Sequence, residues 1–365
     1  MIGQMIVNNV LHRPLRTAIS VLAVGVEVML VVIVVGLTSG LLQDTAKRVE
    51  GVGADIMMQP PSAGIIMAFS GAPMPIRIRE KLEELKYVQA VTPVLLQFNS
   101  SGLEIVYGIE KQSFDAVSGG FVFHEGHELQ GPHDILVDDV YAKSKKVKAG
   151  QVIRLFETDF QVAGVVEHGK GARLFVPIAT LQDLAGSTDK ASVFYVKLTE
   201  PHRTSGVIAE MRKLFPKNEI RPLKDFLSLM TSSSLPGLDA FINSMIAIAV
   251  TIGFLVIFLS MYTTIIERTR EIGVLKALGA SKAYIARALL SESTLVCMAG
   301  IVAGIAMSFG ARKAMVGVFP TLTILITTDW LLRAALIAIV GGLAGAAYPA
   351  WLATRKDPLE ALAYE

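Results

Sequence analysis

Four long apolar stretches constrain this chain more than any other feature of its sequence. A helix needs roughly 20 residues to cross a hydrocarbon core about 30 Å thick. Stretches of at least that length occupy residues 19–42, 241–266, 285–309 and 330–353. Hydrophobic residues make up 52% of the chain and charged residues only 18%, which is unlike a soluble protein. The sequence therefore predicts a membrane protein with four transmembrane α-helices.

The interval between the first two stretches has an ordinary composition, and its roughly 200 residues are enough to bury a core of their own. Helical patterns occur at residues 79–85 and 207–214. Strand patterns occur at residues 94–98, 103–107, 152–156 and 160–166, the last two as a hairpin turning at Glu157, Thr158 and Asp159. We predict an α+β domain between helices 1 and 2, with the first helix continuing beyond the bilayer as a stalk.

Basic residues near the ends of the spans predict the orientation, because Lys and Arg in short loops resist translocation. They lie before the first span, between the second and third, and after the fourth, for example at Arg16, Arg268 and Arg355. Both termini are therefore expected in the cytoplasm, and the α+β domain on the opposite side, the periplasm of a double-membrane bacterium. The net charge of +2 gives no indication of nucleic-acid binding.

Residues 268–281, between the second and third spans, form a short amphipathic segment. Apolar residues recur at helical spacing at Ile272, Leu275 and Leu278, and charged residues fill positions between them. Gly279 is suited to end this helix and Ser281 to cap the next one. Such a segment carries no nucleophile or metal-ligand pair, but it can pass a mechanical push to the spans on either side.

Three separated segments carry a family resemblance. Residues 270–281, followed by Glu292 and Gly300, resemble the signature of the FtsX-like or MacB-like permeases, which are membrane subunits of one class of ABC transporters. Residues 349–362 resemble the end of the same family, and residues 11–19 its N-terminal amphipathic segment. The order of the three segments is also that of the family.

The resemblance implies a permease of the bacterial cytoplasmic (inner) membrane with three parts. Residues 1–42 would form the amphipathic segment and first span, 43–239 a periplasmic core domain with its stalk, and 240–365 the remaining spans and tail. It also implies a coupling helix at 268–281 that docks on a cytoplasmic ABC ATPase. By position its residues are Arg270, Glu271, Ile272, Gly273, Leu275, Lys276, Leu278 and Gly279.

The chain contains no G-x-x-x-x-G-K-[ST] loop, so ATP and magnesium are expected on the partner ATPase and no cofactor or catalytic residue on this chain. Other implied partners are a second permease subunit, giving a homodimer, a periplasmic adaptor or substrate-binding protein, and membrane lipids. The implied function is mechanotransmission that exports or releases a cargo. Alternatives are a regulatory scaffold that activates a periplasmic hydrolase, and a subunit that releases lipoproteins or lipids.

Glu27 departs from the family pattern, because a carboxylate in mid-span costs about 2.5 to 3.5 kcal/mol on insertion scales. One hypothesis places it at a dimer seam or wet cavity, where it binds a polar part of a substrate or a proton. The other makes it a protonated or hydrogen-bonded residue that is paired with a polar residue of the spans, such as Ser260, Thr263 or Ser308.

Three further patterns leave alternatives open. An apolar segment at Ile65, Ile66, Met67 and Phe69 contacts a lipid or partner protein, or folds back on its own domain. Small residues four apart, as at Gly300 and Gly304, pack helices within one subunit or between subunits. The histidines and acids of residues 124–134 do not match H-E-x-x-H, so no metal site is predicted.

Overall fold

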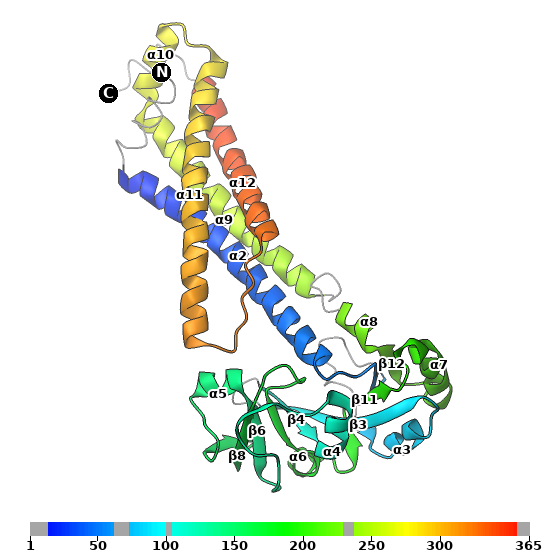
Figure 1. The fold of residues 1–365 in the computed structure, drawn as a ribbon. Coiled ribbons are helices and arrows are strands. Elements are labelled where there is room, and N and C mark those ends of the chain that lie inside the picture. Colours follow the sequence, from blue (N-terminus) through cyan, green and yellow to red (C-terminus); the bar gives the residue numbers. More distant parts are fainter. Residues whose placement is uncertain (1–13, 62–72, 100–103, 229–236, 356–365) are drawn as a thin grey trace. The chain divides into compact units, whose positions relative to one another are not determined.

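The computed structural model describes residues 14–61, 73–99, 104–228 and 237–355 (Figure 1). The chain forms two compact units. The helical unit contains residues 1–39, 237–318 and 324–365, and the mixed unit contains residues 40–236 and 319–323. Each unit is described below by itself.

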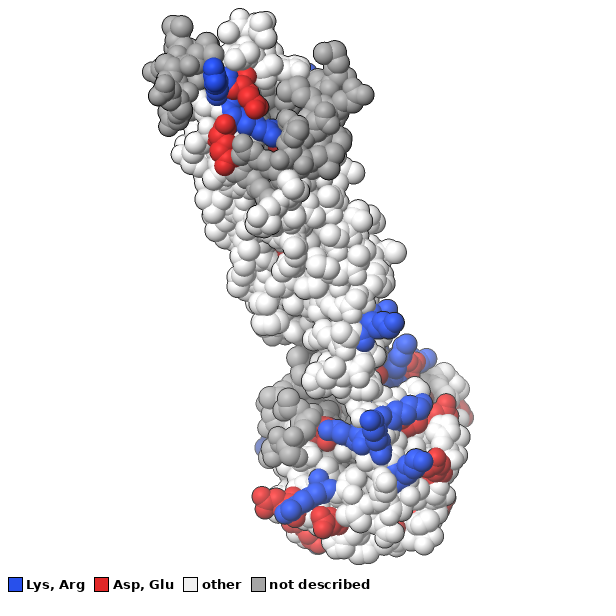
Figure 2. Space-filling view, turned by 90° about the vertical axis from the view of Figure 1, so that its left-hand side faces the viewer, with Lys and Arg blue, Asp and Glu red and all other residues white. Residues whose placement is uncertain are grey.

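Four helices within the described residues are long and apolar enough to cross a membrane, which confirms the prediction from the sequence. They are α2 (Pro14–Glu50), α9 (Leu238–Glu267), α11 (Lys282–Val318) and α12 (Thr328–Arg355). Helix α2 extends past its predicted span and contributes its last turns, from Gly40 onward, to the mixed unit. Charged side chains on the visible surface of the helical unit gather at its ends and are scarce between them (Figure 2).

Close packing of the helical unit depends on glycines. A Cβ atom at Gly304 of α11 would lie 2.6 Å from the carbonyl oxygen of Gly25 in α2, and one at Gly345 of α12 would lie 2.7 Å from the carbonyl oxygen of Phe254 in α9. Without side chains the backbones approach one another closely, which is how helices associate in lipid. The small-residue spacing at these positions therefore packs helices within one chain. The sole cysteine, Cys297, is buried against Gly342 in the same region.

The described part of the mixed unit is built on a ten-stranded sheet with the order β12-β1-β11-β3-β4-β9-β6-β8-β5, in which β7 pairs with β8. The pairs β4/β9 and β6/β8 are parallel and the other pairs of this sheet are antiparallel. The strands are β1 (Ile56–Gln59), β3 (Val88–Asn99), β4 (Glu104–Ile109), β5 (Phe123–Gly126), β6 (Asp134–Asp138), β7 (Val152–Leu155), β8 (Thr158–Val166), β9 (Leu174–Pro177), β11 (Val193–Leu198) and β12 (Glu219–Pro222). A separate pair joins β2 (Met74–Pro75) to β10 (Lys190–Ala191).

Helices cover both faces of this sheet, so the predicted α+β domain is confirmed. They are α3 (Ile78–Glu83), α4 (Lys111–Ser118), α5 (Asp139–Lys145), α6 (Ile178–Leu184), α7 (Thr204–Leu214) and α8 (Leu223–Ser228). Alternate residues of each strand point to opposite faces. One face forms a single cluster with α4, α8 and the end of α2, whereas the other divides into a cluster with α5 and α6 and a cluster with α3 and α7.

The predicted hairpin is present, but its turn lies earlier than the sequence indicated. Strands β7 and β8 pair Leu155 with Thr158, so the loop consists of Phe156 and Glu157 alone. Both loop residues have positive φ, at 50° and 62°, as the two central residues of a type I′ turn require. Neither is Gly, Asn or Asp, which is why the sequence pointed to the polar residues that follow.

Candidate coupling site

Helix α10 (Thr269–Ala277) lies between α9 and α11, and local capping chemistry fixes its junction with α11. The amide of Ala280 donates to the carbonyl of Leu275, the amide of Gly279 donates to that of Lys276, and Gly279 has a φ of +92°. This is a Schellman C-cap, with glycine at the left-handed position. The Ser281 hydroxyl then accepts a hydrogen bond from the amide of Tyr284 at 3.2 Å. The roles predicted for Gly279 and Ser281 are therefore confirmed.

The inner face of α10 attaches to the other helices. Ile272 is buried in the core of the helical unit, and Thr269 and Gly273 are buried beside it. The ammonium group of Lys276 donates to the carbonyl oxygen of Thr354, near the end of α12, at 2.7 Å. Just before α10, Arg268 forms an ion pair with Glu292 of α11 at 3.4 Å. A displacement of α10 would therefore act on α9, α11 and α12 together.

The outer face of α10 is exposed and partly apolar. Arg270 and Glu271 are exposed, Val274 is 41% exposed and Leu278, just past the helix end, is 81% exposed. The prediction that Leu278 shares an apolar face with Ile272 is wrong, because Ile272 is buried and Leu278 points away from the core. Glu271, Val274 and Leu278 follow one another at i, i+3 and i+7, so they share a side of the helix. We call these three residues the outer face of α10.

A second candidate lies at the C-terminal end of α2, where two arginines and two aspartates form a charged cluster. Asp44 accepts a hydrogen bond from Arg173 at 3.1 Å and pairs with Arg48 at 3.2 Å. Arg173 also donates to Asp138 at 2.9 Å, and Asp138 caps α5 by accepting from the amide of Tyr141. Burial lowers the pKa of Arg48 and raises that of Asp138, although the guanidinium of Arg173 opposes the latter shift. The cluster joins the end of α2 to the start of α5 and to the residue before β9.

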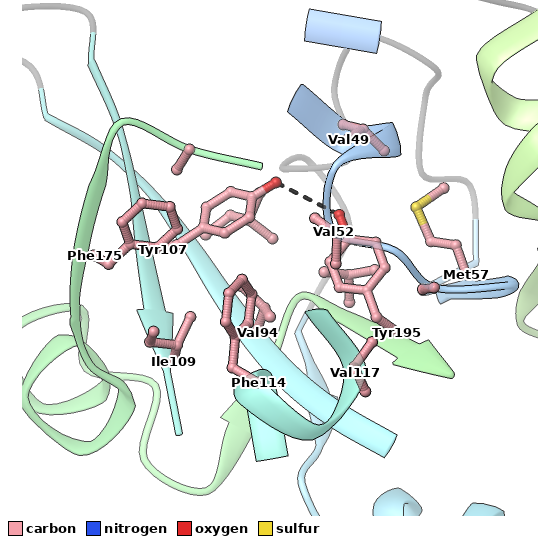
Figure 3. Close-up of a cluster of buried hydrophobic side chains, with 14 of the residues drawn as sticks. Val49, Val52, Met57, Val94, Tyr107, Ile109, Phe114, Val117, Phe175 and Tyr195 are labelled. Atoms are coloured by element: carbon pink, nitrogen blue, oxygen red, sulfur yellow. Dashed lines mark hydrogen bonds between the residues drawn. The ribbon is translucent and has the colours of Figure 1, made fainter. Parts of the chain in front are cut away.

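The backbone around this cluster is also fixed. The carbonyl of Arg48 accepts a hydrogen bond from the amide of Gly171 at 2.7 Å. Val49 and Val52 enter the large cluster on one face of the sheet, where the hydroxyls of Tyr107 and Tyr195 lie 3.5 Å apart (Figure 3). The end of α2 is therefore part of the core of the mixed unit, held by apolar burial as well as by charge.

Glu27 lies inside the helical unit and not on its surface, with 6% of its area exposed within one chain. A Cβ atom at Gly253 of α9 would meet its Oε2 atom at 1.8 Å, so only glycine leaves room for this carboxyl group. Its Oε1 atom is buried without a hydrogen-bond partner among the described residues.

The sequence offered Ser260, Thr263 and Ser308 as hydrogen-bond partners for Glu27, and these residues form hydrogen bonds elsewhere. Ser260 bonds to Ser20 at 2.8 Å, Thr263 to the carbonyls of Leu259 and Ser260, and Ser308 to the carbonyl of Gly304. A place at a dimer seam does not agree with burial of Glu27 inside its own chain. What remains of the two hypotheses is a polar residue that is buried inside the helical unit.

Two other patterns were singled out in the sequence, an apolar segment and a group of histidines and acids. Ile65, Ile66, Met67 and Phe69 lie outside the described residues. Within the residues that are described, no group of three or more His, Cys, Asp or Glu side chains is arranged to hold a metal ion.

Comparison with known protein families shows which family this chain belongs to. The family described as MacB-like periplasmic core domain matches residues 17–214, and the family described as FtsX-like permease C-terminal matches residues 243–358. The chain belongs to the MacB/FtsX-like permease family. It is accordingly a multi-pass membrane protein and a permease component of the ABC transporter class.

Curated relatives of this permease include proteins named macrolide export ATP-binding/permease protein MacB. The protein from Mannheimia succiniciproducens is 26% identical, over 99% of this chain and 60% of its own length. The protein from Vibrio parahaemolyticus is 24% identical, over 96% of this chain and 58% of its own length. The chain thus spans about 60% of the length of these relatives.

Solved structures similar to this permease include two extramembrane domains. The periplasmic region of MacB from Actinobacillus actinomycetemcomitans is 17% identical, with a TM-score of 0.39, over 50% of this chain and 95% of that one. The extracellular domain of the noncanonic ABC-type transporter YknZ from Gram-positive bacteria is 14% identical, with a TM-score of 0.35, over 46% of this chain and 99% of that one.

Proposed function

We propose that this chain is the permease of an ABC system in which a separate ATPase docks on the outer face of α10. The exposed carboxylate and apolar side chains of Glu271, Val274 and Leu278 carry this proposal. Leu278 lies in the turn between α10 and α11, and its apolar side chain is exposed. An apolar residue beside a charge at a helix end suits a protein contact.

Contacts within the chain support a mechanical role for this site. Helix α10 holds α12 through Lys276 and α11 through the adjoining Arg268. Helix α11 packs on α2 at Gly25 and Gly304, and α2 continues without a break to Asp44 and Arg48. A push on α10 would therefore pass through α11 to α2, and α2 alone would carry it to the charged cluster of the mixed unit.

In this proposal the three parts of the chain, residues 1–42, 43–239 and 240–365, have separate tasks. The termini and α10 lie in the cytoplasm, and the mixed unit faces the periplasm, where its change of shape exports or releases a cargo with the help of an adaptor. Two copies assemble as a homodimer. The names of the relatives join ATP-binding to permease, which supports the pairing with an ATPase.

The proposal is tested by purifying the full chain with its partner ABC ATPase and measuring both binding and nucleotide hydrolysis in lipid nanodiscs. Leu278→Asp places a charge on the outer face of α10 and should abolish both the binding and any stimulation of hydrolysis. Val152→Asp is the matched control, because Val152 is also apolar and 63% exposed but lies in the mixed unit. Equal binding of the ATPase by both variants would refute docking at α10.

A further inference from the structure

The carboxyl group of Glu27 occupies a place that the mechanical role does not explain. It is buried between α2 and α9, one of its oxygens lacks a hydrogen bond, and Gly253 is shaped to receive it. In the part of the chain that the structure describes, Glu27 forms no ion pair. An ionised carboxyl group without a partner is costly in such surroundings, whereas the neutral acid is tolerated.

The neighbours of Glu27 supply no compensating charge. Helix α9 faces it with Gly253, which has no side chain. Helix α11 presents the thiol of Cys297, which interacts with Glu27, and α12 packs against that thiol with Gly342. At the α10 end of the bundle, Arg268 and Glu292 pair with each other.

A small cavity lies in the same bundle, about two helical turns from Glu27 toward α10. It has a volume of about 20 Å³ and is lined by Ser20, Ile257, Ser260, Met261, Ser293 and Val296. A cavity of this size has room for about one water molecule, and a buried water needs two to four polar partners. The polar groups of its lining are the hydroxyls of Ser20, Ser260 and Ser293. Ser20 donates to Ser260 and Ser293 donates to the carbonyl of Gly342, so each hydroxyl oxygen can still accept a hydrogen bond from water.

The serines that line the cavity lie on the same sides of their helices as the residues around the carboxyl group. Ser20 precedes Glu27 by seven residues, which is about two helical turns on the same side. Ser260 follows Gly253 by seven residues, and Ser293 precedes Cys297 by four. On all three helices the step from Glu27 to the cavity leads toward α10.

We propose that Glu27 is an exchangeable proton-binding site, reached by water from the α10 end of the bundle through the cavity between Ser20, Ser260 and Ser293. The packed bundle holds the carboxyl group in its neutral form. Separation of α2 from α9 would hydrate the group and favour release of the proton. The permease would then bind a proton in step with the packing of its helices, whatever its cargo.

Infrared spectroscopy of the full chain in lipid bilayers tests this site. We expect a carbonyl band of a protonated carboxyl group that is absent from Glu27→Gln and that shifts after transfer to D₂O. In the double variant Ser20→Ala, Ser293→Ala the shift should be slower by about tenfold, because water in the cavity loses hydrogen-bond partners. Thr251→Val is the control, since the Thr251 hydroxyl bonds to its own helix on the exposed side of α9 and should leave the rate unchanged.

Three outcomes would overturn the proposal: absence of the Glu27 band, a band that fails to exchange over hours, or an exchange rate that the serine substitutions leave unaltered. If Glu27→Gln does not fold, the wild-type chain still decides the first point. Dicyclohexylcarbodiimide reacts with protonated carboxyl groups in apolar surroundings, and peptide mass spectrometry locates the adduct. An adduct at Glu27 supports the proposal, and its absence at acidic pH contradicts it.

Discussion

The guanidinium group of Arg173 donates a hydrogen bond to the carboxylate of Asp44 at 3.1 Å, although 129 positions separate the two residues in the chain. Arg173 also binds Asp138, so it links the end of α2 to the cap of α5. Both acids pair with this one side chain, and Asp44 also pairs with Arg48. The contact makes the stalk end of α2 an integral part of the mixed unit.

Replacing Arg173 by Met should destabilise the mixed unit by about 3 to 5 kcal/mol, because it leaves the buried carboxylate of Asp138 without its ion-pair partner. Thermal unfolding of the full chain in nanodiscs measures the effect. Lys143→Met removes the exposed pair with Asp139 and should cost at most about 1 kcal/mol. A similar melting temperature for both variants would show that the Arg173 cluster contributes little.

Asp139 should make the mixed unit sensitive to strong acid. Burial opposes ionisation of this carboxyl group, but hydrogen bonds from Lys143 and His168 outweigh it and lower the pKa from 3.8 to about 2. A lowered pKa in the folded state contributes stability above pH 3.8, and that contribution is lost as the pH falls toward 2. Asp139→Asn should therefore lose less stability than the wild type across this window.

Chemical denaturation at a series of pH values between about 5 and 2 checks this prediction. Glu210→Gln, on the exposed side of α7, serves as the control and should follow the wild-type profile. Parallel curves for Asp139→Asn and the wild type would contradict the assignment.

Gly304→Ala should force α2 and α11 apart, since the added Cβ atom would lie 2.6 Å from the carbonyl oxygen of Gly25. Overpacking of this kind typically costs about 1 to 3 kcal/mol. Gly310→Ala lies on the same helix with no atom within 4 Å of the new Cβ, so it should be neutral or slightly stabilising. The melting temperatures of the two variants in the same lipid provide the comparison.

Gly279→Ala should reorient α10, because φ at this position is +92° and a side chain there costs about 1 to 2 kcal/mol. Asn tolerates this conformation better, so Gly279→Asn should retain more ATPase stimulation than Gly279→Ala. The ratio of the two stimulated hydrolysis rates measures the effect. If Ala and Asn impair stimulation equally, the backbone conformation is not what positions α10.

Local chemistry made part of this fold predictable. Long apolar runs predicted the four helices, and the roles of Gly279 and Ser281 followed from hydrogen bonds that span only a few residues. Leu278 was misplaced because six residues at 3.6 residues per turn carry it about 120° around the helix from Ile272, so the two residues lie on different sides.

Long-range pairing was beyond the sequence. Nothing in the residues near Asp44 indicates that Arg173 is its partner, because that contact exists only once the sheet has formed. The same holds for Glu27, whose receiving position is Gly253, a residue marked by the lack of a side chain. The match between Glu27 of α2 and Gly253 of α9 is visible only after the helices are aligned.

The burial of Cys297 has a practical consequence for watching this permease at work. Its thiol is enclosed by α12, and it is the only cysteine in the sequence. Cysteines introduced at Ala277 and Val152, which are both exposed, would therefore react with spectroscopic labels while the native thiol stays protected. Such a doubly labelled chain would report the distance between α10 and the mixed unit through a cycle of nucleotide hydrolysis, and the native cysteine would not have to be removed first.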